Sequence, residues 1–286
     1  AAGLGLVPQV RRDPATTTTF GVGELLLAAA EAPGIRHLIV GLGGSATNDG
    51  GAGILQAAGW RLLDAAGRVL PPGGAALAAL DRIETGSPDP WRNLESVVIA
   101  CDVSNPLCGS DGASAVFGPQ KGADPAAVAR LDAALAHFAT IAGAPSFPGA
   151  GAAGGAAYGL RLLFPEAHVR PGIEIVLDAV DFDARLRGAD LVVTGEGRLD
   201  AQTGGGKAVS GVVARASRAG VPVVAIVGGF DPSISPGKLG LAAVLPSVPG
   251  PVGLVESIRN GADWIVDAAE RAAHWVRLGR ELSAKK

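Results

Sequence analysis

The sequence predicts an α/β protein built on parallel sheets. Five short runs rich in Val, Ile and Leu indicate buried strands, at residues 37–40, 96–103, 191–194, 222–227 and 242–248. Segments with the apolar spacing of helices lie between these runs. In such folds ligands bind where loops leave the carboxyl ends of strands, and the two glycine-rich segments 41–53 and 194–207 lie at such places.

The clearest helix begins at Asp124, which precedes a proline. Its apolar face carries Val128, Leu131, Leu135, Phe138 and Ile141. Further helices are predicted at 23–32, 47–59, 205–219 and 252–282, the last with a break near Asn260. The Gly/Pro-rich stretch 143–159 is too rich in small residues to predict a core element, so we expect a hinge or a substrate loop there.

Length and composition limit the classes of function. The 286 residues suggest two domains, which we divide into 1–178 and 179–286. A net charge of -3 provides no basic field for nucleic acid or a membrane surface, so small ligands are favoured. No apolar run is long enough to span a membrane, no signal peptide is evident, and Cys101 and Cys108 form no disulfide framework, so a cytoplasmic protein is expected.

Segment 41–53 allows three interpretations. Gly41, Gly43 and Ala46 match the G-x-G-x-x-[GA] fingerprint of dinucleotide-binding proteins, which predicts a nicotinamide-dependent oxidoreductase. The polar residues between 45 and 49 instead suit a hydroxy acid or a metal-bound water. Such residues also cap helices, so an ordinary capped turn is the third interpretation.

Segment 194–207 suits Mg-ATP without being a Walker loop, because Ala201 and Ala208 replace residues that this motif requires. Carboxylates suit the hard cation, and Lys or Arg suits phosphate charge. The segment holds both kinds of group: Glu196, Arg198, Asp200 and Lys207. An exposed charged loop is the alternative.

A third segment places Asp102 just after a strand and Lys121 in a constrained Gly-Pro-Gln-Lys-Gly turn. Asp102 could face the same cleft, and Lys121 suits either anion contact or solvent. None of the four histidines lies in a glycine motif, which disfavours a His-based triad or metal cluster.

Five motifs occur together and in order: GGSATNDGGAG at 43–53, ACDVSNPL at 100–107, GPQKGA at 118–123, GAGAAGG at 149–155 and TGEGRLDAQT at 194–203. From residue 1 to about 273 the chain closely resembles the bacterial glycerate kinase type I family. The resemblance implies a flavodoxin-like parallel-sheet domain split by an inserted α/β domain. Residues 1–178 would be mostly the inserted domain, and 179–286 the C-terminal half of the flavodoxin-like domain.

The resemblance also implies phosphorylation of D-glycerate by ATP and Mg²⁺, at the 2-hydroxyl, with the 3-hydroxyl as an alternative. The chain departs from the family in two places. The family's opening strand with an Ala-Pro-Asp-Ser-Phe-Lys motif, and a later Asp-Gly-Gly-Glu-Gly, have no counterpart, so the N-terminal part of the first domain is expected to be missing. After Lys207 the family usually reads Val-Pro-Ile-Gly, whereas this chain reads Ala-Val-Ser-Gly.

Phosphoryl transfer needs mainly alignment, charge neutralisation and one proton acceptor. We therefore predict these roles: Asp49, Asp200 and Lys207 as catalytic residues; Gly44, Ser45, Thr47, Asn48, Asp102 and Lys121 on the substrate; Gly195, Glu196, Gly197 and Arg198 on the nucleotide; Glu196 and Asp200 on magnesium. An oxidoreductase and an inactive glycerate- or ATP-binding protein stay open. The oligomeric state is open as well, with a homodimer as one option.

Overall fold

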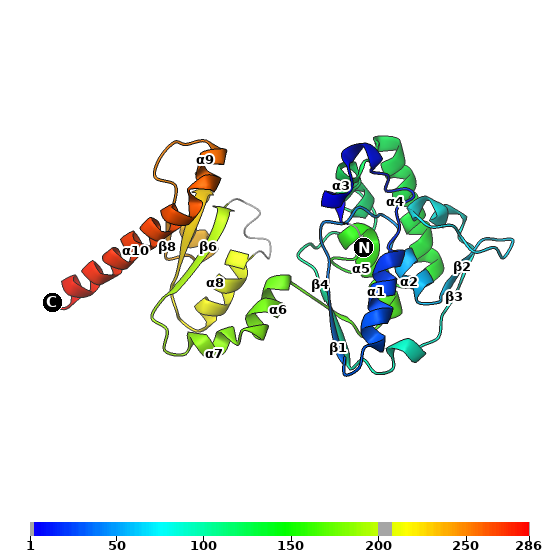
Figure 1. Ribbon diagram of the computed structural model, residues 1–286, viewed down its shortest axis with the longest axis horizontal. Helices are drawn as coiled ribbons and strands as arrows, with labels where there is room; N and C mark the ends of the chain where they lie inside the picture. Colours follow the sequence, from blue (N-terminus) through cyan, green and yellow to red (C-terminus); the bar gives the residue numbers. More distant parts are fainter. Residues whose placement is uncertain (1–2, 200–207, 286) are drawn as a thin grey trace. The chain divides into compact units, whose positions relative to one another are not determined.

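The computed structural model describes residues 3–199 and 208–285. Its contacts divide the chain into two units, Ala1–Gly172 and Ile173–Lys286 (Figure 1). The boundary expected near Asp178 lies inside α6 (Gly172–Ala179), the helix with which the second unit begins. No helix of the described residues has the length and apolar character needed to cross a bilayer.

The first unit is organised by a three-stranded parallel sheet in the order β1-β4-β5. Its strands are β1 (His37–Gly41), β4 (Ser96–Ala100) and β5 (His168–Arg170), with His37 opposite Ser96 and Val98 opposite His168. A separate antiparallel pair joins β2 (Arg61–Leu63) to β3 (Arg82–Glu84). Val97 and Ile99 of β4 are buried, whereas Ile39 of β1 is 62% exposed, so only one face of the sheet is covered.

Helices cover that face, and Figure 1 shows them together on one side of β1 and β4. They are α1 (Phe20–Glu31), α2 (Ala52–Ala57), α3 (Ala113–Phe117), α4 (Pro125–Ala142) and α5 (Ala152–Leu163), with the 3-10 turns η1 (Leu4–Leu6), η2 (Gln9–Arg11), η3 (Gly74–Ala79), η4 (Asp89–Trp91) and η5 (Pro119–Lys121). As predicted, α4 begins at Asp124, whose side chain accepts a hydrogen bond from the Ala127 N–H, and buries Leu131, Leu135 and Phe138.

The second unit has its own parallel sheet in the order β6-β7-β8. Its elements are α6, α7 (Phe182–Leu186), β6 (Val192–Leu199), α8 (Ala208–Arg218), β7 (Val223–Phe230), η7 (Pro236–Leu239), β8 (Ala243–Pro246), α9 (Leu254–Arg259) and α10 (Gly261–Ser283). The predicted parallel sheets and the break at Asn260 between the last two helices are thus confirmed.

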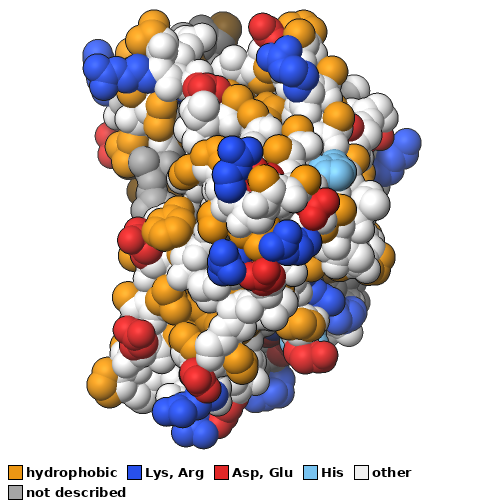
Figure 2. All heavy atoms as spheres, turned by 90° about the vertical axis from the view of Figure 1, so that its right-hand side faces the viewer, with side chains coloured by type: hydrophobic (Ala, Val, Ile, Leu, Met, Phe, Trp, Pro, Cys, Tyr) orange, Lys and Arg blue, Asp and Glu red, His pale blue; other side chains and the backbone are white. Residues whose placement is uncertain are grey.

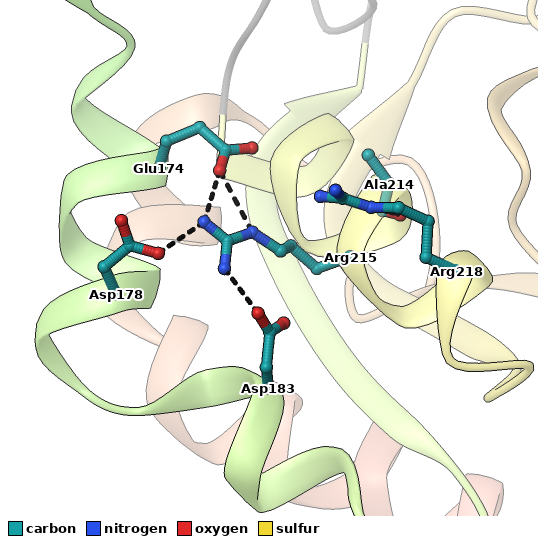
Figure 3. A network of polar contacts seen from close by, with 6 residues as sticks. All are labelled: Glu174, Asp178, Asp183, Ala214, Arg215 and Arg218. Carbon is teal, nitrogen blue, oxygen red and sulfur yellow. Dashed lines mark hydrogen bonds and ion pairs between the residues drawn. The ribbon is translucent and has the colours of Figure 1, made fainter.

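One arginine ties the helices of the second unit together (Figure 3). Arg215 of α8 donates hydrogen bonds to Glu174 and Asp178 of α6 and to Asp183 of α7, with its Nη1 atom 2.7 Å from the Asp183 carboxylate. These partners raise the pKa of the guanidinium above its usual range. Arg215 therefore holds α6 and α7 against α8.

The strands β2, β3 and β5 were not predicted, and two expectations about the first unit were wrong. The segment 143–159 is not a loop throughout, because α5 begins at Ala152 and from Gly149 to Leu160 every residue except Ala153 is buried, although Ala153, Gly154 and Gly155 are non-helical. Small residues here serve close packing of backbones rather than flexibility. The helix expected from residue 47 begins only at Ala52, because Gly50 and Gly51 adopt left-handed conformations with φ of +66° and +79°.

Candidate functional site

A pocket of about 300 Å³, lined by both polar and apolar residues, lies in the first unit, beside the carboxyl ends of β1 and β4. It is lined by Leu42, Gly43, Gly44, Ser45, Asp102, Val103, Phe117, Gln120, Lys121, Ala152 and Ala153. Four of the six residues predicted to bind substrate therefore line one pocket, namely Gly44, Ser45, Asp102 and Lys121. This is the edge at which parallel sheets bind ligands.

The glycine turn takes its shape from a second glycine-rich segment packed against it. The Gly50 N–H donates to the Gly154 carbonyl at 2.9 Å. A Cβ atom at Gly154 would lie 1.9 Å from the Thr47 carbonyl oxygen, and one at Gly159 would lie 2.6 Å from the Gly51 Cα. Because no side chain fits between these backbones, glycines are needed on both sides.

Asp49 holds the turn from inside. Its carboxylate accepts hydrogen bonds from the N–H and hydroxyl of Thr19, at 2.7 and 2.9 Å, and from the N–H groups of Gly51 and Gly53, at 3.1 and 3.2 Å. Its side chain is fully buried, and burial raises its pKa above the usual range although these bonds act in the opposite direction. We infer that Asp49 orders the turn and the start of α2, which leaves its predicted role as proton acceptor without support from its surroundings.

Asn48 is also buried, and its side-chain amide donates to the Ser114 hydroxyl of α3 at 2.8 Å. Its Oδ1 atom is buried and has no hydrogen-bond partner in the described part of the chain. Asn48 does not line the pocket, so it would act on a ligand through the turn. Thr47 directly precedes Asn48 in the turn, and its carbonyl oxygen accepts a hydrogen bond from the Lys121 ammonium.

Lys121 provides the positive charge of the pocket. Its ammonium donates to the Ser45 hydroxyl at 2.9 Å and to the Thr47 carbonyl at 2.7 Å, and the residue is only 2% exposed. Burial lowers the pKa of Lys121 to about 8, while the nearby Asp49 carboxylate acts in the opposite direction. An ammonium has three donors, so among the described residues one N–H is available beyond these two contacts.

Asp102 supplies a carboxylate at the pocket wall, as its position after a strand predicted. It is exposed, and one oxygen accepts a hydrogen bond from the Gly172 N–H at 2.7 Å. The pocket thus offers an ammonium, a hydroxyl and a carboxylate within a small volume. A short molecule that carries both a carboxylate and a hydroxyl group complements these three.

Ala153 is a conformational exception in the pocket wall. It has φ +52° and ψ +40°, and among the described residues other than glycine only Asp181 also has a positive φ. A left-handed conformation costs an alanine ~1–2 kcal/mol. The Ala153 methyl packs against the core cluster around Ile99, but a buried methyl contributes only about 0.8 kcal/mol.

The residues predicted to bind nucleotide belong to the second unit and lie within a strand. Residues 195–198 are part of β6, which continues to Leu199 instead of ending at Thr194 as expected. Gly195 permits this pairing, because a Cβ atom there would lie 2.8 Å from the Ile226 carbonyl oxygen. Glu196 and Arg198 lie two residues apart on the strand and so share one face.

The pKa of the Asp231 carboxyl is lowered, mainly by hydrogen bonds from Ser233. The nearby positive charge of Arg198 contributes to the same shift. Asp200 and Lys207 lie outside the described residues. Within 3–199 and 208–285, no three His, Cys, Asp or Glu side chains gather to hold a metal.

A larger groove of about 610 Å³ lies between β6, β7 and α10, and most of its lining is apolar, including Leu191, Val193 and Ile226. It offers little to orient a small polar substrate. The smaller pocket is therefore the candidate site. Figure 2 shows acidic and basic side chains interspersed over one face of the molecule rather than gathered by sign.

Of the residues around the site that sequence reasoning missed, which include the pocket-lining Phe117 and Ala152, three have roles described above: Thr19, Ser114 and Ala153. Thr19 directly precedes α1, so its position as a helix cap was a usable signal. The other two gave none, because their roles depend on tertiary contacts. The dinucleotide interpretation of segment 41–53 also weakens, since α2 does not start directly behind the first glycines and Asp49 occupies the N–H groups at its beginning.

Fold and site together define an α/β protein with a small-molecule pocket at the carboxyl edge of a parallel sheet. The chain matches the glycerate kinase family over residues 1–277 and belongs to that family. It is 44% identical to glycerate kinase of Bacillus subtilis (strain 168), over 99% of this chain and 75% of that protein. It is 41% identical to glycerate 2-kinase of Escherichia coli (strain K12), over 98% of this chain and 74% of that protein.

A solved structure agrees with these relatives. The crystal structure of a protein assigned as glycerate kinase 2 from Salmonella typhimurium LT2 matches with a TM-score of 0.80 at 42% identity. The match covers 99% of this chain and 74% of that one. The chain thus spans about three quarters of the length of these relatives.

Proposed function

We propose that this protein transfers the γ-phosphoryl group of ATP to the 2-hydroxyl of D-glycerate. The observation that carries the proposal is the pocket in which Lys121, Ser45 and Asp102 meet, because its groups complement a short hydroxy acid. Membership in the glycerate kinase family and a relative named glycerate 2-kinase support the reaction and the choice of hydroxyl.

On the acceptor side, Lys121 and Ser45 would bind the carboxylate of glycerate, and Asp102 would accept a hydrogen bond from a hydroxyl. Gly44 allows the substrate to approach the backbone closely, since its φ of +57° suits glycine. Thr47 and Asn48 would keep this wall in place. Fixing a small substrate in this way supplies the alignment on which phosphoryl transfer depends.

On the nucleotide side, Gly195, Glu196, Gly197 and Arg198 would contact ATP, with Lys207 on its phosphates. Magnesium in kinases takes one or two carboxylates and completes its shell with phosphate oxygens and water, so Glu196 and Asp200 form a sufficient donor set. When bound, Mg²⁺ would neutralise phosphate charge. Asp200 would accept the proton of the attacking hydroxyl. A cytoplasmic location and association into dimers stay predictions.

The reaction is tested by following ADP release from the purified protein with D-glycerate and Mg²⁺, each omitted in turn. We expect release only when both are present, and ³¹P NMR should identify 2-phosphoglycerate. A 3-phosphoglycerate product would correct the position of transfer. Oxidation of glycerate with a nicotinamide cofactor, without ADP release, would contradict the kinase proposal.

The division into two sides is tested by variants. Ser45→Ala should raise the KM for glycerate, Lys207→Ala should raise the KM for ATP, and Asp200→Asn should lower kcat with little change in thermal stability. Ser110→Ala is the matched control, because Ser110 is exposed and does not line the pocket. Equal effects of Ser45→Ala and Lys207→Ala on both KM values would contradict the division.

A further inference from the structure

Ala153 has a left-handed backbone conformation that the two residues after it adopt for a clear reason. Gly154 and Gly155 have φ of +71° and +86°, and a Cβ atom on them would lie 1.9 Å from the Thr47 carbonyl oxygen and 2.7 Å from the Gly50 Cα. Close packing on the glycine turn therefore forces this part of the chain into left-handed turns and excludes side chains at both positions.

Residue 153, just before these glycines, has the same left-handed conformation, and glycine would be the unstrained residue there. Residue 153 lines the pocket together with Ala152, and it differs from its neighbours because it is the one residue between Gly149 and Leu160 that is not buried. A strained residue at a ligand pocket is an observation from which a functional role can be inferred. The methyl group is the only thing that alanine adds over glycine.

The position of Ala153 in the pocket wall suggests what its methyl group does. The polar groups of Lys121, Ser45 and Asp102 would fix the carboxylate and a hydroxyl of a bound acid, while Phe117, Ala152 and Ala153 supply apolar wall. The carbon chain of the acid would then meet this wall. Removing a methyl group from it enlarges the space for a longer chain.

We propose that Ala153 is a specificity-determining residue, whose methyl group limits the pocket to three-carbon hydroxy acids. This inference rests on the proposed function, since it takes D-glycerate as the substrate. It gives the strained alanine a role in selecting substrates by chain length, which a purely structural residue would not have.

The test compares D-glycerate with its four-carbon homologue D-erythronate. Ala153→Gly should raise kcat/KM for D-erythronate relative to D-glycerate at least about tenfold, the lower end of what one methylene group contributes in a substrate pocket. Ala153→Ser, which enlarges the side chain, should shift the ratio in the opposite direction. Ala156→Gly is the matched control, because it removes a methyl group from a buried position of α5 that does not line the pocket.

Binding of both acids, measured by isothermal titration without ATP, separates this inference from the proposed function. An absence of turnover by the wild type would overturn the kinase proposal, while the ratio of the two affinities would still test Ala153. An unchanged ratio in Ala153→Gly, in turnover and in binding, would overturn the inference and return the methyl group to a packing role. A shift of the same size in Ala156→Gly would overturn it as well.

Discussion

The Lys121 ammonium lies 2.9 Å from the Ser45 hydroxyl, although 76 positions separate the two residues in the chain. This contact joins the end of η5 to the glycine turn behind β1. It gives the candidate pocket a buried cation beside a hydroxyl group, a pair that suits a carboxylate. The charge on Lys121 should therefore control how well the pocket binds its substrate.

The KM for D-glycerate should rise as the pH increases through about 8, because the Lys121 ammonium loses its proton there. Asp49, which is near Lys121, and Asp102, which lines the same pocket, are the carboxylates of this region. Lys121→Met should raise this KM at least about tenfold at pH 7, equivalent to ~1.4 kcal/mol, and should remove the rise near pH 8. Steady-state kinetics between pH 6.5 and about 9.5 test this. The same rise in Lys121→Met would assign the titration to another group.

Loss of the Lys121 proton, which should weaken substrate binding, should raise the free energy of unfolding. The pKa of this lysine falls from 10.5 to about 8 on folding, so between these values the unfolded chain binds a proton that the folded chain lacks. The unfavourable contribution of the buried charge is full below pH 8 and fades as the pH rises toward 10.5. Relative to Lys121→Met, the wild type should gain up to about 3 kcal/mol across this range. Urea unfolding at pH 7.5 and pH 10 measures it, and a constant difference would contradict the prediction.

Two aspartates of the first unit should respond differently to the same substitution. Asp49→Asn places an NH₂ group among donors that the carboxylate satisfies and should cost about 2–4 kcal/mol of stability. Asp102→Asn alters an exposed residue and should change stability by less than about 0.5 kcal/mol while raising the KM for glycerate. Thermal unfolding and steady-state kinetics separate the two. A stable but inactive Asp49→Asn would restore Asp49 as a catalytic residue.

Much of this fold could be predicted from local sequence. Apolar runs identified β1, β4, β6, β7 and β8 but not the short strands β2, β3 and β5, and the Asp124 cap located α4. These signals depend on neighbouring residues. The segment behind residue 143 could not be predicted in this way. Its alanines and glycines resemble a loop, yet α5 is buried because the glycine turn packs directly on its backbone.

The candidate site also has residues whose placement could be predicted from the sequence and residues whose roles could not. Ser45, Asp102 and Lys121 belong to turns that follow or face strand ends, so their gathering at one edge of the sheet could be expected. The different tasks of Asp49 and Asp102 could not be expected. Asp49 is buried and bonded to Thr19, whereas Asp102 is exposed beside Gly172, and both are tertiary properties. The strain at Ala153 is likewise invisible in a run of alanines and glycines.

The second unit offers a test of its arginine network. Arg215→Met should lower the Tm, because it leaves Glu174, Asp178 and Asp183 without the cation that joins α6 and α7 to α8. Arg218→Met is the control on the same helix, because the Arg218 guanidinium donates a hydrogen bond to the Ala214 carbonyl of its own helix and does not join α8 to α6 or α7 within the described residues. Equal losses of Tm for the two variants would show that the network does not stabilise the unit. High salt should reduce the difference between them.

The last prediction concerns two neighbouring positions of α5. Gly154→Ala should destabilise the first unit by at least about 3 kcal/mol, because the new Cβ atom would lie 1.9 Å from the Thr47 carbonyl oxygen at a residue whose φ is +71°. Ala153→Gly should change stability by less than about 1 kcal/mol, since relief of the left-handed strain offsets the lost methyl contact and the greater freedom of glycine in the unfolded chain. Chemical unfolding of both variants measures the contrast. A tolerated Gly154→Ala would mean that the two glycine-rich segments do not pack as closely as their backbones indicate, and the shape of the pocket would then need another source.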